Sequence, residues 1–371
     1  MADGPQIPDH LHKVAFADLA GWREDDHAAA LESFLRLCGK PEVLDASPTF
    51  PRVAPGILEA LCDEGKRSGR ASADAARRFF ETWFTPYRVD RKGFVTAYFE
   101  PELAASREKT LDYAVPLLKK PDGLEPVGVA DRPRDWPAHL SHGRRVNGKL
   151  TEMPDRGAIM AGALDEENLE LVWLADPVDA FYVHVQGSAR LRLADGTVMR
   201  VGYAGKTGHP YTGIARLLVE RGEGTPEDFT MSGTRAWLEA HPEERDALFR
   251  KNRSYIFFRE VTEVGSEDGP VGAAGLALSA GRSLAVDPDH IPYGGLVFVG
   301  TDFDLPAAGG TFRRLMVADD TGSAIKGPAR GDVFVGSGET AGAIAGEIRH
   351  PATFTLLVPN LALGSGTVVT D

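Results

Sequence analysis

Two segments near the carboxyl end of the chain, AVDPDHIPYG at residues 285–294 and DDTGSAIKGPARGDVFVGSG at residues 319–338, decide how this sequence is interpreted. Three aspartates, Asp287, Asp320 and Asp332, lie in them where an apolar strand meets a glycine-rich turn. A folded scaffold commonly presents its functional side chains to a cleft at such junctions. We therefore expect these three carboxyl groups to mark a site on a β-rich domain.

Asp332 is the strongest candidate for chemistry because it is followed directly by Val333, Phe334 and Val335. A carboxyl group among apolar neighbours and near another carboxyl keeps its proton to a higher pH. A general acid that works at neutral pH requires this property. The alternative, and the more frequent outcome for any single aspartate, is a turn former whose side chain bonds nearby backbone amides.

Residues 320–323, Asp-Thr-Gly-Ser, also match the signature of aspartic proteases. That mechanism needs two carboxylates that share one proton, supplied by two lobes or by a dimer. Because the chain holds one copy, a single-chain enzyme of that class is excluded. Ala318 and Asp319, which precede the motif, do not fit the dimeric form either.

The composition is that of a folded globular protein, with 371 residues, 43% hydrophobic and 26% charged. This length predicts two domains or one large one, and no apolar run reaches the roughly 20 residues of a membrane-spanning helix. A net charge of −13 without a basic block argues against a nucleic-acid partner. The 41 glycines and 25 prolines favour a turn-rich, mainly β architecture.

Helices are expected in the first hundred residues, and β structure in most of the rest. Capping residues and apolar spacing predict helices at 28–38, at 56–66 and from Ser72 to a stop at Pro86. A strand is expected at 93–99, followed by a proline-punctuated stretch of loops and short strands from 103 to 154 that opens a second domain. Further strands are expected at 169–174, 181–185, 190–193, 198–203 and within 255–359, and helices at 155–164, 211–221, 234–251 and 339–348.

The two cysteines, Cys38 and Cys62, form neither a CxxC pair nor part of a His/Cys cluster, so we expect no zinc site. Two buried thiols and one disulfide both remain open. The first ten residues lack the regions of a signal peptide, which at face value indicates a cytoplasmic protein. A chain that begins after an export signal would look the same.

Aromatic, amide and hydroxyl side chains occur in three compact runs. They are Thr96, Tyr98, Phe99 and Glu100; His184, Gln186, Gly187 and Ser188; and Tyr203, His209 and Tyr211. Sugars are held by stacking on apolar faces and by oriented hydrogen bonds, so such runs suit a saccharide groove. They are equally compatible with a β core and its edges.

Four long segments together resemble the membrane-bound lytic murein transglycosylase A family. They are VTAYFEP (95–101), DPVDAFYVHVQGSARLRLADGTVMRVGYAGKTGHPY (176–211), AVDPDHIPYG (285–294) and DDTGSAIKGPARGDVFVGSG (319–338). The segments occur in the family's order and span nearly the whole chain from about residue 14. The last part resembles the 3D domain, which is named for three aspartates.

The resemblance implies a mainly β fold with a helical N-terminal segment. A double-psi β-barrel domain would comprise residues 1–102 and 253–371, and a smaller β domain, residues 103–252, would be inserted after the first strand. The groove between them would hold a glycan strand. Family members cleave the β-1,4 bond between N-acetylmuramic acid and N-acetylglucosamine without water and leave a 1,6-anhydro sugar.

Residue by residue, the resemblance matches the catalytic acid to Asp332 and the assisting aspartate to Asp320. Asp287 matches the third aspartate, with a structural role, and Thr96 and Glu100 fall where the family lines its groove. Some members have a hydroxyl residue at the position of Glu100. The full set of expected substrate-binding residues is Thr96, Tyr98, Glu100, Gln186, Gly187, Ser188, Tyr203, His209 and Asp287.

The resemblance implies an enzyme without metal or organic cofactor, whose partner is the glycan strand of peptidoglycan. We expect a periplasmic monomer, associated peripherally with the outer membrane in its precursor form, although this chain shows no lipid-anchoring cysteine. Two alternatives stay open: a peptidoglycan hydrolase that uses Asp320 and Asp332 as an acid/base pair, and a peptidoglycan-binding protein without catalytic activity.

Overall fold

The computed structural model describes residues 7–40, 49–51, 53, 55–67, 69–128, 132–265, 268–305 and 310–363. The chain divides into two compact units, both discontinuous in sequence. The first comprises Met1–Phe99, Ser266–Gly336 and Ile348–Asp371, and the second comprises Glu100–Gly265 and Ser337–Glu347. The second unit is therefore longer at both ends than the predicted insertion at 103–252, and it includes one helix from the C-terminal part of the chain.

The first unit is built on an eight-stranded sheet. Its strands are β1 (Leu11–Lys13), β2 (Phe84–Val89), β3 (Gly93–Glu100), β13 (Ser283–Ala285), β14 (Leu296–Leu305), β15 (Gly310–Asp320), β16 (Arg330–Ser337) and β17 (Arg349–Pro359). They follow the order β1-β2-β17-β14-β15-β13-β16-β3, and β17 also pairs with β3. Six strands, from β17 through β14, β15, β13 and β16 to β3, therefore close into a barrel. The mainly β prediction is confirmed.

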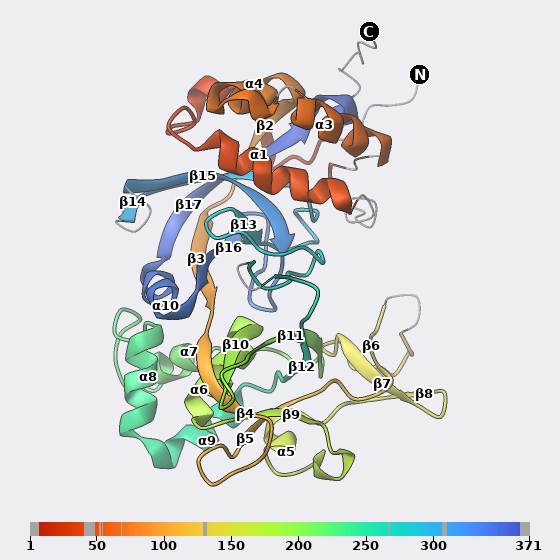
Figure 1. The fold of residues 1–371 in the computed structure, drawn as a ribbon, viewed down its shortest axis with the longest axis vertical. Helices are drawn as coiled ribbons and strands as arrows, with labels where there is room; N and C mark the ends of the chain where they lie inside the picture. The colour runs from red at the N-terminus through yellow and green to blue at the C-terminus, as the bar shows by residue number, and fades with distance from the viewer. Residues whose placement is uncertain are drawn as a thin grey trace. The chain divides into compact units, whose positions relative to one another are not determined.

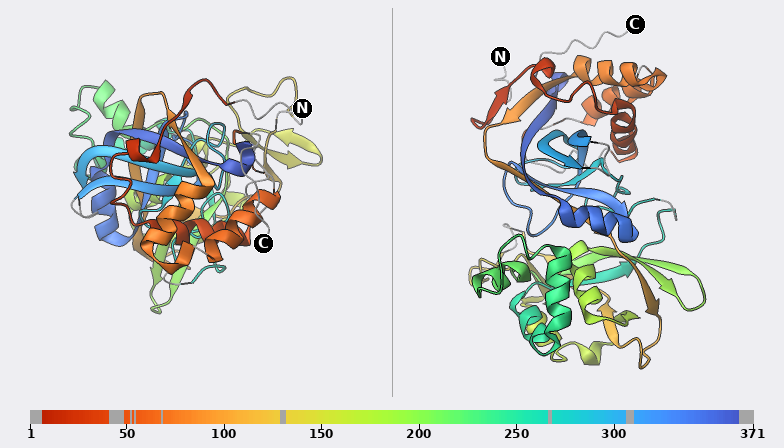
Figure 2. Two further views of the ribbon diagram at one scale, coloured as in Figure 1. Left: turned by 90° about the horizontal axis from the view of Figure 1, so that it is seen from above. Right: turned by 90° about the vertical axis from the view of Figure 1, so that its left-hand side faces the viewer.

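Three α-helices precede the barrel strands in the chain and lie together on one side of the sheet (Figures 1 and 2). They are α1 (His27–Arg36), α3 (Pro55–Arg67) and α4 (Ala73–Trp83), accompanied by the 3-10 turns η1 (Phe16–Asp18), η2 (Leu37–Gly39), η3 (Gly69–Ala71) and, at the other end of the chain, η6 (Asn360–Leu363). Asp26 and Ser72 cap α1 and α4, each accepting a backbone N–H at 3.1 Å. The expected stop at Pro86 is wrong: α4 ends at Trp83, and Pro86 lies inside β2.

An aromatic cluster fixes the helices to the sheet. Phe34 of α1 and Phe79 and Phe80 of α4 pack against one another, with ring centroids 5.2 to 6.4 Å apart. Trp22 connects this cluster to Phe298 of β14, and the centroids of these two rings are 5.4 Å apart. Since each buried aromatic ring removes a large apolar area from water, this cluster supplies much of the cohesion of the first unit.

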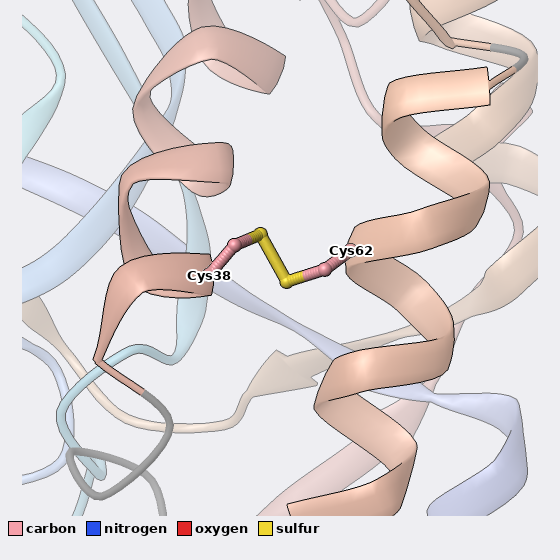
Figure 3. The surroundings of a disulfide bond; sticks show 2 residues. All are labelled: Cys38 and Cys62. Carbon is pink, nitrogen blue, oxygen red and sulfur yellow. A yellow bond between two sulfur atoms is a disulfide. The ribbon is translucent and has the colours of Figure 1, made fainter.

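A disulfide bond joins the turn that follows α1 to the middle of α3 (Figure 3). It links Cys38 and Cys62, whose Cα atoms are 5.7 Å apart and which are separated by 24 residues in sequence. The structure thus selects one of the two possibilities that the sequence left open. A cross-link of this kind restricts the unfolded chain, and the stabilisation grows with the length of the closed loop.

Replacing Cys38 and Cys62 by serine is expected to lower the free energy of unfolding by about 3 kcal/mol, because the unfolded chain regains the freedom of that loop. Denaturant titration monitored by circular dichroism measures the change. A reducing agent should destabilise the original protein by a similar amount and leave the double serine variant unaffected. Equal sensitivity of both proteins to the reductant would contradict the prediction.

The second unit contains a six-stranded sheet and a small three-stranded one. The larger sheet, in the order β12-β11-β10-β4-β9-β5, consists of β4 (Glu102–Ser106), β5 (Val115–Leu118), β9 (Glu170–Leu174), β10 (Ser188–Leu193), β11 (Val198–Lys206) and β12 (Ile256–Glu260); the smaller one consists of β6 (Leu124–Pro126), β7 (His142–Val146) and β8 (Lys149–Thr151). A single bridge between Lys119 and Phe258 connects the two ends of the larger sheet.

Helices also belong to this unit, and one of them, Pro177–Gln186, contacts β5, β9 and β10 of the larger sheet. They are α5 (Arg156–Ile159), α6 (Pro177–Gln186), α7 (Ile214–Glu220), α8 (Met231–Ala240), α9 (Pro242–Lys251) and α10 (Gly338–Glu347), with the 3-10 turn η4 (Asp165–Glu167). Within the described ranges, no helix combines the length and apolar character needed to cross a membrane.

Two sequence expectations in this unit are wrong. Residues 181–185, expected as a strand, lie in α6, because Asp176 caps the Val178 amide at 2.7 Å and Pro177 occupies the first helical turn, where its missing N–H costs nothing. The single helix expected at 234–251 is two helices. The two helices are separated at His241, because Pro242 has no N–H group with which to continue the preceding helix.

Candidate active site

The pairing of β13 with its two neighbours places the two candidate catalytic aspartates. Ala285 of β13 is the register partner of Asp320 on β15 and also of Asp332 on β16. Adjacent strands lie about 4.8 Å apart, so the two aspartate backbones are separated by about 10 Å across one small residue. Register partners on neighbouring strands point to the same face, and the two carboxyl groups therefore share a face of the barrel wall.

A β-bulge beside Ala285 sets which aspartate reaches this face. Leu284 pairs with Ala318, and the next residue, Ala285, pairs with Asp320, so that Asp319 is the extra residue of β15. A bulge re-aims the side chains that follow it. Here it leaves Asp319 buried, where its carboxylate accepts a hydrogen bond from the Ser283 hydroxyl at 2.6 Å, and presents Asp320 on the shared face.

Strand β3 supplies a hydroxyl group to each aspartate. The Thr96 hydroxyl donates a short hydrogen bond to Asp332, and the Tyr98 hydroxyl donates to Asp320 at 2.6 Å. The two residues are two positions apart, and residues with that spacing lie on the same face of a strand. Arg330, two positions before Asp332 on β16, donates to Thr96 at 2.7 Å and so completes a chain from a guanidinium group through a hydroxyl to the carboxyl.

Asp332 holds its proton more tightly than an ordinary aspartate. Its side chain is partly exposed, yet protein atoms surround the carboxyl group closely. Burial raises the pKa of Asp332, and the negative charge of Asp320 raises it further; the hydrogen bond from Thr96 and the charge of Arg330 oppose this without reversing it. The direction is the one expected from its apolar sequence neighbours.

Asp320 is the carboxyl group better suited to carry the negative charge. Burial raises its pKa, but the Tyr98 hydroxyl and the Ala273 amide, which donates at 2.9 Å, both favour the ionised form. Asp320 has more hydrogen-bond donors than Asp332, which favours its ionised form, and a negative charge on Asp320 raises the pKa of Asp332. Two carboxyl groups whose environments separate their pKa values are the usual basis of an acid/base assignment.

Two further acidic residues of the motifs, Asp319 and Asp287, have internal partners. Burial raises the pKa of Asp319 well above its usual value, and the hydrogen bond from Ser283 opposes this without reversing it. Asp287 is also buried, but it accepts hydrogen bonds from the Lys326 ammonium at 3.0 Å and the Gly327 amide at 2.8 Å. Burial acts to raise the pKa of Asp287, and these two donors outweigh it, so the pKa is lowered. Asp287 thus fastens the loop between β15 and β16, a structural contact of the kind that the resemblance implied.

Glu100, at the end of β3, is completely enclosed in the second unit. Its carboxylate accepts hydrogen bonds from Arg190 and from the Ser337 hydroxyl, both at 2.8 Å, and forms an ion pair with Arg200 at 3.0 Å. The side chain has no exposed surface, and a side chain without exposed surface cannot touch a sugar in this conformation. The carboxylate joins β3, β10 and β11 through these partners.

We expect Glu100→Gln to lower the free energy of unfolding by about 3 kcal/mol, because a neutral amide removes the counter-ion of the buried Arg200 and one partner of Arg190. Denaturant titration checks this. Glu102→Gln is the matched control: Glu102 is 40% exposed and lies 3.7 Å from Arg190, so its loss should cost less than about 1 kcal/mol. Equal effects of the two substitutions would overturn the interpretation.

The remaining candidates lie in the second unit. Gln186 ends α6, Gly187 caps it with a φ of 85°, and Ser188 begins β10 as a buried residue. Tyr203 on β11 is 46% exposed, whereas His209 is buried and its Nε2 bonds the Met153 carbonyl at 2.8 Å. The structure thus brings Asp332, Asp320, Thr96 and Tyr98 together, and substrate contact by the second group stays a prediction.

Sequence reasoning missed three contributors to this cluster: Arg330, Asp319 and the backbone amide of Ala273. A signal existed for Arg330, because the spacing of two residues to Asp332 on a predicted strand puts both on one face. For Ala273 none existed, since its amide reaches Asp320 across 47 residues of sequence. In the described ranges, no group of three or more His, Cys, Asp or Glu residues is placed to hold a metal ion.

Two family models match this chain, one over the inserted part and one over the C-terminal part. Residues 94–259 match the family model of the MltA-specific insert domain, and residues 282–358 match that of the 3D domain. A membrane-bound lytic murein transglycosylase of Agrobacterium tumefaciens is 39% identical, with 95% of this chain and 98% of that one covered and a TM-score of 0.84. MltA of Neisseria gonorrhoeae is 30% identical over 96% and 95% of the two chains, with a TM-score of 0.74.

A curated relative, membrane-bound lytic murein transglycosylase A of Escherichia coli K12, is 35% identical over 232 residues, and the match spans 60% of its length. The matches to these two domain models and to solved transglycosylases place the chain in the class of lytic murein transglycosylases. Within that class, the chain belongs to the membrane-bound lytic murein transglycosylase A family.

Proposed function

We propose that this protein cleaves the β-1,4 bond between N-acetylmuramic acid and N-acetylglucosamine in peptidoglycan and leaves a 1,6-anhydromuramic acid end. Family membership supports the substrate and the type of reaction. The observation that carries the assignment of the chemistry is the raised pKa of the partly exposed Asp332 carboxyl group, opposite the better stabilised Asp320. No cofactor is part of the proposed reaction.

In the first step, protonated Asp332 donates its proton to the glycosidic oxygen, and the bond from that oxygen to C1 of muramic acid breaks. In the second step, the Asp332 carboxylate removes the proton of the C6 hydroxyl group while the C6 oxygen forms a bond to C1. The carboxyl group ends in its starting state. A glycosidase normally needs a second carboxylate to activate water or to attack C1; here the hydroxyl of the same sugar takes that place.

Asp320 supports the reaction as a carboxylate. The sugar ring carries positive charge as the bond to C1 breaks, and a fixed negative charge on the same face of the barrel stabilises it. Tyr98 and the Ala273 amide hold Asp320 in position. Arg330 and Thr96 do the same for Asp332, and the guanidinium charge also favours the anion that exists between the two steps.

Three further points belong to this proposal. The barrel is of the double-psi type, for which β13 offers support, since it runs parallel to β15 and antiparallel to β16. The enzyme is a periplasmic monomer that acts on glycan strands, in peripheral association with the outer membrane, in keeping with the name of its family. The insertion at 103–252 provides one wall of the groove for the glycan strand.

Asp332→Asn should reduce the release of muropeptides from sacculi by about a thousandfold, because the amide keeps the shape of the side chain but has no proton to donate. Mass spectrometry of the products measures the rate and identifies the reaction, since an anhydro product is lighter by one water than a product of hydrolysis. Asp90→Asn, an exchange at a largely exposed residue of the same unit, is the control and should retain full activity. Near-normal activity of the Asp332 variant would refute the mechanism.

The rate of cleavage plotted against pH should fall on both the acidic and the alkaline side of an optimum. Activity falls as the pH rises through the raised pKa of Asp332, because the acid is lost, and it falls at low pH as Asp320 becomes protonated. Tyr98→Phe removes a donor that favours ionised Asp320, so the pKa of Asp320 rises and the acid limb moves to higher pH. Profiles of kcat/KM for soluble muropeptide oligomers test this. An acid limb that stays in place in the Tyr98 variant would contradict the role given to Asp320.

A further inference from the structure

The second unit contains a cavity of about 870 Å³ that the aspartate cluster does not use. Its wall is formed by the segment that leads into β5, by α5 and the turn after it, by β9, and by one side each of α6 and α9. The side chains that matter below are Lys109, Arg156, Trp173, Phe181, His184 and Tyr255. Pockets that bind small organic ligands have volumes of about 300 to 1,000 Å³ and mostly apolar walls with a few polar groups.

Arg156 is a buried positive charge that has no acidic partner among the residues that the structure describes. Its side chain is 5% exposed, and its guanidinium group lies against the rings of Phe181 and Tyr255, 5.0 and 5.1 Å from the ring centroids. Nε and Nη2 donate to the backbone carbonyls of Asn252 and Ser254 at 2.8 to 3.1 Å. Burial lowers the pKa of Arg156 to about 10, which leaves the group protonated at neutral pH.

A buried charge normally has a counter-ion, and in the described part of the chain no carboxylate pairs with Arg156. Three acids line the cavity: Asp165, Glu170 and Asp246. Asp246 is instead within 3.3 Å of Arg245. At the side of the cavity, the Lys109 ammonium group lies 5.2 Å from the centre of the Trp173 ring and adds a second positive charge.

Two neutral donors adjoin the guanidinium group. Burial, followed by the charge of Arg156, lowers the pKa of His184 well below its usual value, and its Nδ1 accepts the Ile256 amide at 3.4 Å. The ring proton must then be on Nε2. Tyr255 packs edge-on against His184, with centroids 4.3 Å apart, and burial raises the pKa of its hydroxyl, which stays protonated. Among described residues, neither this hydroxyl nor His184 Nε2 has a hydrogen-bond acceptor.

We propose that this cavity binds the terminal carboxylate of a short apolar peptide. A planar guanidinium group matches a carboxylate in geometry and charge, and His184 and Tyr255 supply further donors to the same anion. The apolar walls, which include Met160 and Leu164, suit small aliphatic side chains next to that carboxylate. This peptide can be the stem peptide of peptidoglycan, which ends in D-alanine, or an ordinary L-peptide. The first possibility rests on the proposed function.

The test uses the full chain and three probes: N-acetyl-D-alanyl-D-alanine, its L,L isomer, and the D,D peptide with an amide in place of the terminal carboxylate. Binding is followed in ¹H–¹⁵N spectra through the indole N–H signal of Trp173, assigned with Trp173→Phe. We expect saturable shifts with at least one carboxylate probe and a loss of about tenfold in affinity for the amide. A preference for the D,D probe identifies the stem peptide, and a preference for the L,L probe identifies an L-peptide.

Tyr255→Phe keeps the ring beside Arg156 and removes only the hydroxyl donor, so it should weaken binding several-fold without unfolding the protein. Tyr182→Phe is the matched control, since Tyr182 donates to the Met231 carbonyl and does not line the cavity. Arg156→Lys replaces the planar guanidinium group by a single ammonium group and should weaken binding further. The melting temperature of this variant shows whether it is folded.

Absence of a Trp173 shift up to about 10 mM probe, equal binding of the amide probe, or an unchanged affinity in Tyr255→Phe would each overturn the proposal. The same titration on Asp332→Asn separates this result from the proposed function. Peptide binding should be unchanged there, whatever happens to cleavage of sacculi.

Discussion

The register of β13 between β15 and β16 is the constraint on which the site depends. In a strand the side chains alternate between two faces, so a slip of one residue would turn each of them to the opposite side. Ala285 faces Asp332 through the regular pairing of β13 with β16, and it faces Asp320 because the bulge at Asp319 adds one residue to β15. Without the bulge, Ala285 would face Asp319 instead, and Asp320 would turn to the opposite side of the sheet.

Burial makes the proposed proton transfer possible and is also a cost to stability. Asp319, Asp320 and Asp332 all have raised pKa values, chiefly because protein surrounds them. What distinguishes them is the number and kind of donors, and these come mostly from other strands. Thr96 and Tyr98, on β3, each donate a hydrogen bond to one aspartate, so one short segment far from the aspartates in sequence gives the two carboxyl groups different surroundings.

Local signals in the sequence predicted much of this fold, and contacts between distant segments account for the rest. The caps Asp26 and Ser72, and the aspartates beside glycine turns, could be located because their evidence lies within a few residues. Residues 181–185 were misassigned because a run of β-type residues outweighed the Asp176-Pro177 helix start. The links from Thr96 to Asp332 and from Glu100 to its arginines could not be predicted, since they span some 90 to 240 residues.

The pairing of β3 with β17 also sets an order of events during biosynthesis. Thr96 and Arg349 are register partners, so the barrel of the first unit cannot close until β17 has left the ribosome. The sheet of the second unit, by contrast, is complete once Glu260 has emerged. A chain that folds as it emerges would therefore form the inserted sheet first and bring Asp320 and Asp332 together only afterwards.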